Sequence, residues 1–226
     1  MNNMDISLGD AFFEGTAVVP ETHPEAGNRI SYAQRIIDNP SLHAAAHNAG
    51  ATNRNPEGIG FWALVTEDYR AQEAGFFSQG FWALFWHRFG NWRMSVHPKP
   101  LRAPLSLMYK VGAKLTQWFA GVDLPYTVNV GRRVRIEHFG GMILIARAIG
   151  DNVIIRQNTT FGLAQTDLVR QWPAIGDGVD IGTGAAILGQ IDVGRGAKIG
   201  ANAVVLKDVP AGAVAVGVPA RIVRKP

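Results

Sequence analysis

The chain has 226 residues, of which 47% are hydrophobic and 18% charged, and it contains no cysteine. This composition is typical of a folded globular protein with a sizeable core, and it excludes disulfides, thiolate metal sites and cysteine nucleophiles. The net charge of +4 suits an anionic cofactor, but no dense basic block indicates nucleic-acid binding.

Residues 1–57 are interpreted as an irregular N-terminal extension of unknown role, in which a short helix is predicted from Ser31 to Ile37. The first residues lack the basic and apolar regions of a signal peptide, so we expect a cytoplasmic protein. His43 and His47 have the i, i+4 spacing of a metal pair on a helix. The absence of a third ligand nearby favours packing or solvent-facing histidines instead.

Residues 58–121 are predicted to form a helical region, because apolar residues recur there at spacings of three and four. The predicted helical segments are 60–72, 76–95 and 104–121. The second segment is unusually aromatic. Two interpretations are open for it: a face that contacts a membrane surface, or a helix that packs on other helices or on the end of the next domain.

Residues 122–226 are dominated by a six-residue rhythm of aliphatic residues. A period of six fits neither a helix nor a single strand, and it is typical of a parallel β-helix, in which glycine and asparagine form the corners. We expect roughly four coils and a loop at 163–174, where the rhythm breaks. The inward positions are predicted at Val130, Ile136, Ile143, Ile149, Ile155, Phe161, Ile175, Ile181, Ile187, Val193, Ile199 and Val205.

His138 is the candidate catalytic residue of this domain. It follows Glu137 and precedes two glycines, Gly140 and Gly141, after one intervening residue. Asp123 lies fifteen residues earlier, close to one coil back. A carboxylate bonded to one ring nitrogen fixes the tautomer and leaves the other nitrogen free to accept a proton. A lone histidine in such a place is either structural or a general base.

The stretch from Asp123 to Pro226 resembles the catalytic region of hexapeptide-repeat acetyltransferases of the serine acetyltransferase group. The resemblance rests on the segments DLPYTVNVGRRVRIEH, DNVIIRQNTTFG and IGDGVDIGTGAAILGQIDVGRGAKIGANAVVLKDVPAGAVAVGVPARIV. It implies a left-handed β-helix and a trimer that holds acetyl-CoA between neighbouring subunits. It also implies a His–Asp pair that activates the acceptor hydroxyl, with no metal.

The resemblance assigns roles by position. His138 matches the general base, Asp123 its partner and Glu137 the acidic residue that precedes the histidine. The basic residues of the tail, Arg221, Arg224 and Lys225, either meet the cofactor's phosphates or only increase solubility. The positions expected at the cofactor are Gly162, Thr183, Gly184, Lys198 and Ala201, with Arg221 and Arg224 in the tail.

Two departures from the serine enzymes bear on the acceptor. Gln171 and Trp172 stand where those enzymes carry an arginine and a histidine, and an aromatic ring suits the apolar face of a sugar. The aspartate-proline-alanine segment that precedes the helices in those enzymes is also absent, and TEDYRAQEAGFFSQGFWALFWHRFGNW stands in its place. This pattern, with Glu67 to Ala71 ahead of an aromatic helix, resembles bacterial exopolysaccharide O-acetyltransferases of the colanic-acid type. Within it, Asp68 and Arg70 either reach the acceptor or are surface helix charges.

The sequence therefore predicts an acetyl-CoA-dependent O-acetyltransferase that acts on a sugar hydroxyl in surface or exopolysaccharide biosynthesis. The alternatives are a serine O-acetyltransferase of cysteine biosynthesis and a non-enzymatic β-helix scaffold. A β-helix carbonic anhydrase is excluded, because it needs three histidine ligands on the coils. The expected partners are a small-molecule or glycan acceptor and further copies of the chain, as a homotrimer or a dimer of trimers. The aromatic helices could also contact a membrane.

Overall fold

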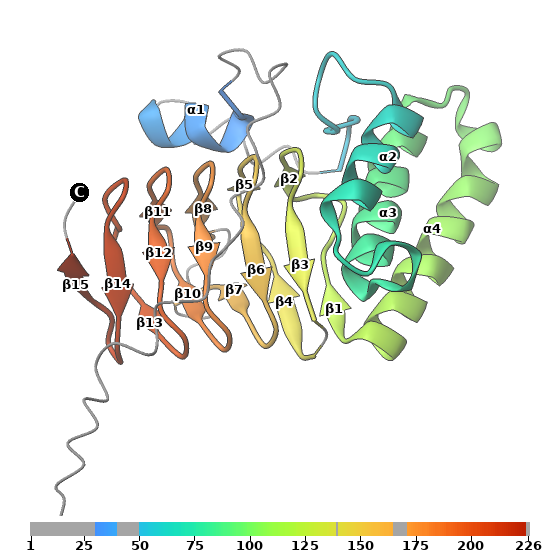
Figure 1. The fold of residues 1–226 in the computed structure, drawn as a ribbon. Coiled ribbons are helices and arrows are strands. Elements are labelled where there is room, and N and C mark those ends of the chain that lie inside the picture. The colour runs from blue at the N-terminus through green and yellow to red at the C-terminus, as the bar shows by residue number, and fades with distance from the viewer. Residues whose placement is uncertain (1–29, 40–49, 139, 165–170, 225–226) are drawn as a thin grey trace, which may run out of the picture.

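The computed structural model describes residues 30–39, 50–138, 140–164 and 171–224. Its main body is a three-sided parallel β-helix, which carries a layer of helices at one end and a short helix against one side (Figure 1). This arrangement confirms the predicted fold class, a mainly β protein in which a helical region precedes a β-helix.

Three sheets form the sides of the β-helix, and we call them sheets A, B and C. Sheet A contains β1 (Val122–Asp123), β4 (Met142–Leu144), β7 (Thr160–Gly162), β10 (Ala186–Leu188) and β13 (Val204–Val205). Sheet B contains β2 (Asn129–Val130), β5 (Ala148–Ile149), β8 (Ala174–Ile175) and β11 (Asp192–Val193). Sheet C contains β3 (Arg135–Glu137), β6 (Ile154–Arg156), β9 (Asp180–Ile181), β12 (Lys198–Ile199), β14 (Val214–Val216) and β15 (Arg221–Arg224).

The chain visits sheets A, B and C in turn, so one coil consists of one strand from each. Sheet A contains five strands, and the stack therefore has five coils rather than the four expected. On the fifth coil, a parallel bridge from Val209 to Val193 replaces a strand of sheet B. β15 runs antiparallel to β14 and closes the C-terminal end.

The predicted inward column is buried at every position except Ile143, whose side chain is 45% exposed. Its neighbour Leu144 takes the inward place instead. The cause is a longer corner: Ile136 and Leu144 are eight residues apart, whereas Ile155 and Phe161, at the same places on the next coil, are six apart. The corner that contains His138 therefore has two extra residues.

Helix α1 (Tyr32–Asp38) confirms the short helix predicted from Ser31, whose side chain caps it by accepting a hydrogen bond from Gln34 N at 3.1 Å. Its buried residues pack on sheet B. The remaining helices are α2 (Phe61–Ala71), α3 (Gln79–Trp92) and α4 (Lys99–Ala120), with 3₁₀ turns η2 (Gly75–Phe77) and η3 (Arg93–Ser95). α3 contacts both α2 and α4, as well as the first coil.

Helix α3 is the predicted aromatic helix, and the structure favours packing over a membrane-facing role for it. Phe81, Leu84 and Phe89 are buried. The ring of Phe81 packs edge-to-face on Trp82, and that of Phe89 packs edge-to-face on Trp86.

One amide side chain from the helical layer satisfies the open edge of sheet C. Gln72 donates from Nε2 to Val134 O at 2.8 Å, and its Oε1 accepts from Ile136 N at 3.2 Å. β3 is the outermost strand of sheet C, so these backbone groups have no neighbouring strand on that side. The side chain supplies the hydrogen bonds that another coil would have made.

A buried ion pair between α2 and α3 joins the helical layer to sheet B. Arg88 donates to Val130 O at 2.7 Å and to Gly131 O at 2.5 Å, and its Nε lies 2.8 Å from Asp68 Oδ2. Burial raises the pKa of Asp68, and the Arg88 guanidinium opposes that rise. Both sequence interpretations of Asp68 are therefore wrong: it is neither a surface charge nor able to reach an acceptor, because it is almost fully buried.

Candidate active site

His138 lies at the corner between β3 and β4, with its backbone in the left-handed region at φ 64°. On the following coils, the same row of corners has Asn158, Gly184 and Asn202 at similar φ values. Few side chains adopt this conformation, and asparagine and histidine are enriched among those that do. The corner leaves the imidazole exposed, and within the described ranges no side chain or backbone group hydrogen-bonds to it.

Asp123 occupies the outer face of sheet A on the first coil. The corner after His138 is tied to the chain just before Asp123 by a hydrogen bond from Met142 N to Gly121 O at 2.8 Å. Asp123, at the start of the first coil, and His138, at its end, therefore lie near the same corner of the β-helix. Their side chains are not hydrogen-bonded to each other; instead, Asp123 Oδ1 accepts from Nε2 of Gln117 on α4 at 2.8 Å.

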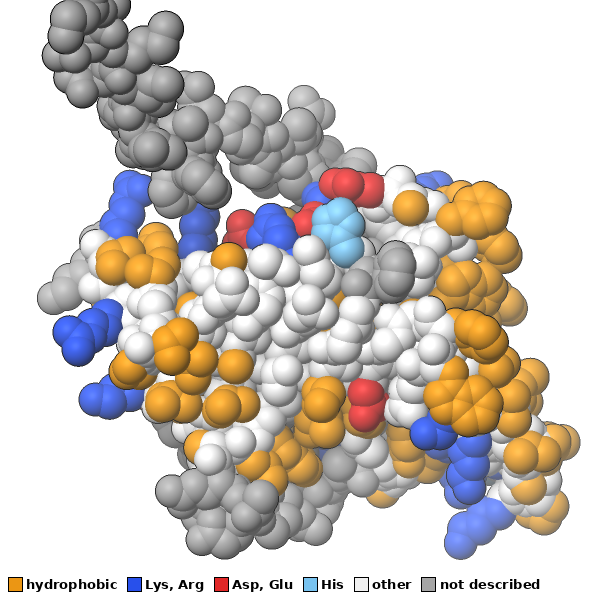
Figure 2. All heavy atoms as spheres, turned by 90° about the horizontal axis from the view of Figure 1, so that it is seen from below, with side chains coloured by type: hydrophobic (Ala, Val, Ile, Leu, Met, Phe, Trp, Pro, Cys, Tyr) orange, Lys and Arg blue, Asp and Glu red, His pale blue; other side chains and the backbone are white. Residues whose placement is uncertain are grey.

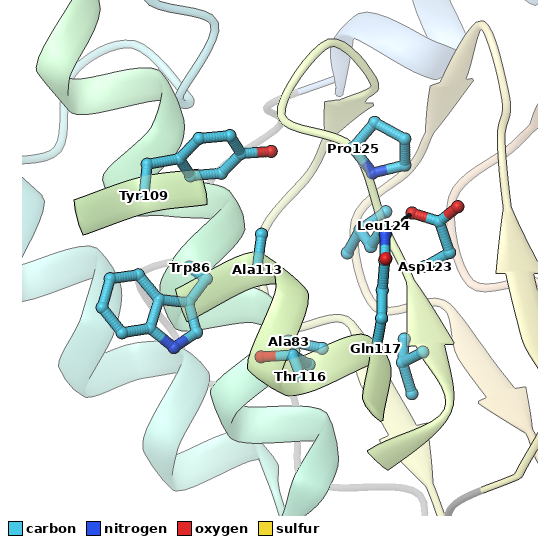
Figure 3. A pocket seen from close by; sticks show the side chains of 10 residues that line it. Ala83, Trp86, Tyr109, Ala113, Thr116, Gln117, Asp123, Leu124 and Pro125 are labelled. Atoms are coloured by element: carbon cyan, nitrogen blue, oxygen red, sulfur yellow. Dashed lines mark hydrogen bonds between the residues drawn. The ribbon is translucent and has the colours of Figure 1, made fainter. Parts of the chain in front are cut away.

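A pocket of about 250 Å³ opens beside Asp123, between α3, α4 and β1. Figure 3 shows Asp123 and Gln117 on one side of it, and the rings of Trp86 and Tyr109 on the other. Thr116 adds a further polar side chain to the lining. The pocket therefore combines a carboxylate with aromatic walls.

Glu137 is held between two arginines. Arg135 and Glu137 are two residues apart on β3 and so lie on the same face of the strand, where they form an ion pair. The parallel register sets Glu137 beside Arg156 of β6, whose Nε lies 3.2 Å from Glu137 Oε2. The two guanidinium groups fix this carboxylate next to His138. Sequence reasoning missed both arginines, although the i, i+2 spacing was visible.

Gln171 and Trp172 lie far from His138 within one chain. They end the loop between β7 and β8, on the third coil, at the edge of sheet A opposite to the row of corners that contains His138. Buried Arg147 holds the end of this loop, because its Nε donates to Trp172 O at 2.7 Å. The middle of the loop, 165–170, lies outside the described residues, as do His43 and His47.

Three of the expected cofactor residues share the row of corners with His138. Thr183 and Gly184 form the corner on the third coil, and Ala201 belongs to the corner on the fourth. A Cβ on Gly184 would collide with the amide oxygen of Asn202, so that side chain would have to move. Gly162 differs, because it ends β7 at the other edge of sheet A.

Lys198, expected near the cofactor, and the tail residues Arg221 and Arg224, expected at its phosphates, lie on sheet C. Lys198 pairs with Val214, which in turn pairs with Arg224, so the two basic residues stand in one row across neighbouring strands. Arg221 is also on β15, and all three basic side chains are exposed. The row offers separate cations to an anionic ligand at the C-terminal end of the β-helix.

Two negative findings apply to the described part of the chain. It contains no group of three or more histidine, aspartate or glutamate side chains placed to hold a metal ion. None of its helices combines the length and the apolar character needed to span a membrane.

The fold and the row of corners define a hexapeptide-repeat protein, and comparison with known proteins narrows that class. No family model matches the chain. The serine acetyltransferase of Mycobacterium tuberculosis is 36% identical over 154 residues, which are 68% of this chain and 64% of that protein. The serine acetyltransferase of Salmonella typhimurium is 40% identical over 149 residues, 66% of this chain and 52% of that one.

Solved structures agree with this result. The soybean serine acetyltransferase apoenzyme is 34% identical with a TM-score of 0.61, covering 72% of this chain and 69% of that chain. The serine acetyltransferase of Brucella abortus in complex with coenzyme A is 26% identical with a TM-score of 0.62, covering 86% of both chains. The chain belongs to the serine acetyltransferase family of hexapeptide-repeat proteins. It spans about half to two thirds of the length of the curated relatives it matches.

Proposed function

We propose that the protein is an acetyl-CoA-dependent O-acetyltransferase in which His138 is the general base. The observation that carries this proposal is the exposed imidazole of His138 on an extended corner, next to a fixed Glu137 and on the same coil as Asp123. The family membership supports the same chemistry, and one of the related structures contains coenzyme A.

In this mechanism, His138 accepts the proton of the acceptor hydroxyl as its oxygen attacks the acyl carbon. General-base catalysis of this kind contributes a factor of about 10²–10⁴ in rate. Gln117 holds one oxygen of Asp123, which leaves the other oxygen to orient the imidazole and to stabilise its protonated form. His138 then returns the proton to the leaving group. Acetyl-CoA supplies the activated acetyl group, and Lys198 and Arg224 offer cations that match its phosphates.

The acceptor is proposed to be L-serine in the first instance. The relatives are serine acetyltransferases, so the comparisons favour serine, the alternative acceptor in the sequence analysis, over a sugar hydroxyl, the main prediction there. A sugar hydroxyl, as in exopolysaccharide biosynthesis, stays the second candidate. It is favoured by Gln171 and Trp172 in place of a cationic pair, and by the aromatic walls of the pocket beside Asp123.

A homotrimer, alone or paired into a dimer of trimers, is part of the same proposal. Trp172 and His138 lie at opposite edges of sheet A in one chain, and a neighbouring copy is the simplest way to bring such residues to one site. A cytoplasmic location fits a protein that uses acetyl-CoA.

The test is a comparison of His138→Ala with the wild type in an assay of coenzyme A release, with serine, amino sugars and nucleotide sugars as acceptors. We expect kcat to fall by about 10²–10⁴ with an unchanged circular dichroism spectrum. His97→Ala is the matched control, because His97 is also exposed but lies between η3 and α4. Near-wild-type turnover by a folded His138→Ala protein contradicts the mechanism. Absence of acetyl-CoA binding in calorimetry favours the scaffold alternative.

A further inference from the structure

Helix α4 presents an apolar face to solvent. Its small residues Gly112 and Ala120, together with Thr116, face the rest of the helical layer and are buried. Trp118 and Phe119 are 72% and 80% exposed. The exposed apolar side chains of α4 are Leu101, Leu107, Met108, Val111, Leu115, Trp118 and Phe119. At 100° per residue, they occupy one arc of about 120° around the helix.

A border of lysines runs along this apolar arc. Lys99, Lys110 and Lys114 are exposed and lie within about 60° of one another around the helix axis, on the side next to Leu107. The helix contains no aspartate or glutamate over its 22 residues. In Figure 2, hydrophobic side chains gather over the helical end of the molecule, and Lys and Arg side chains lie beside them.

We propose that α4 docks on an anionic phospholipid bilayer, lying in the plane of the membrane surface. An apolar arc with Trp and Phe and a lysine-rich border is the pattern of interfacial helices, whose apolar face enters the boundary between headgroups and acyl chains. The lysine stems follow the apolar surface and place their charges among the phosphates. This proposal stands apart from the proposed catalytic function.

The charge distribution disfavours a symmetric antiparallel pair of α4 helices as the arrangement that covers this face. In a symmetric antiparallel pair of α4 helices, the lysine border of one helix lies against the lysine border of the other. Lys110 and Lys114 of both helices then approach one another, with no acidic residue on α4 to compensate them. An anionic lipid surface complements the same border.

Docking through α4 also determines how far the first coil, which carries the candidate site, lies from the membrane. The helix ends at Ala120, and Asp123 follows three residues later on β1. The membrane surface is therefore close to the end of the β-helix that carries the candidate site.

The test is binding of the full-length protein to vesicles, followed by co-sedimentation. Vesicles of phosphatidylcholine with about 30 mol% phosphatidylserine are compared with pure phosphatidylcholine. We expect binding to the anionic vesicles only, with a partition coefficient that falls as salt is added. Lys110→Gln/Lys114→Gln lowers it about 30-fold, since each lysine near an anionic surface contributes about 1 kcal/mol. The control Lys207→Gln, an exposed lysine after β13, leaves it unchanged.

A second pair of variants tests the apolar arc. Trp118→Ser/Phe119→Ser is expected to lower the partition coefficient by about tenfold or more. Val223→Ser removes a 65% exposed apolar residue on β15, at the other end of the β-helix, and should have no effect. Equal binding to both vesicle types, or equal binding by the Trp118 variant, overturns the proposal. If the wild type ignores vesicles and this variant lowers the oligomeric state in sedimentation velocity, the face is an interface between copies.

Discussion

Acidification is expected to destabilise the protein through one buried histidine, His87. This residue of α3 is 1% exposed, and its Nε2 lies 2.9 Å from Val128 O on the first coil. Burial, helped by the charge of Arg88, lowers its pKa from 6.5 to about 3. The ring is therefore neutral in the folded protein, with Nε2–H donating to the carbonyl of Val128. In the unfolded chain, the same ring titrates at its ordinary value.

The size of the effect follows from the difference between the two pKa values. The folded pKa is the lower one, so the contribution of His87 to stability is complete above pH 6.5 and is lost as the pH falls toward about 3. At pH about 5, the ring in the unfolded chain is about 1.5 pH units below its pKa and is protonated, whereas the ring in the folded protein stays neutral. At 1.36 kcal/mol per unit, the free energy of unfolding falls by about 2 kcal/mol.

The assay is urea denaturation of the wild type and of His87→Gln at pH about 7.5 and about 5. Glutamine places an amide N–H near the position of Nε2 and does not titrate. The pH dependence of every other group, including Asp68, is common to both proteins and cancels in the difference. The wild type should lose about 2 kcal/mol more than the variant. Equal losses in both proteins refute the assignment of a neutral, buried His87.

Three further predictions concern stability, each measured by urea denaturation. Asp68→Asn leaves Arg88 buried without its counter-charge and should cost about 3–5 kcal/mol; a loss under 1 kcal/mol contradicts the buried pair. Gln72→Ala strands two backbone groups of the first coil and should cost about 2–4 kcal/mol; a neutral result means that water replaces the amide. Gly184→Ala should cost more than Gly178→Ala, although both have positive φ, because only Gly184 is crowded; equal costs contradict this.

The six-residue spacing predicts most of the β-helix, because each coil repeats the same short-range pattern. The one error in the inward column, Ile143, has a local cause. The sequence shows the slip in spacing after Ile136, but either of two neighbouring aliphatic residues can restore the rhythm there. Only the pairing of Leu144 with Phe161 decides between them.

The closure of the first coil could not be predicted, because its contacts join distant segments. Gln72 and Ile136 are 64 residues apart, and Arg88 and Gly131 are 43 apart. In the sequence, Asp68 and Arg88 look like ordinary charges on amphipathic helices. Their burial depends on which helix faces reach the β-helix, and periodicity alone does not determine that.

The sequence was enough to select the candidate residues of the site but not to predict their surroundings. His138 and Glu137 stand out in the sequence as the ionisable pair next to an irregular corner. The arginine clamp on Glu137 depends on the register of β3 against β6, which places Arg156 beside it. The hydrogen bond between Gln117 and Asp123 depends on how α4 meets β1.

The two ends of the stack are closed in different ways, and this bears on how such proteins can change length in evolution. Helical side chains fix the first coil, which carries His138, whereas the antiparallel strand β15 closes the last. In a solenoid, each coil interacts mainly with its neighbours. Whole coils between β9 and β14 can therefore be duplicated or deleted without moving His138. Such a change would leave the first coil in place, but it would move or remove the proposed cofactor residues, Lys198 and Arg224.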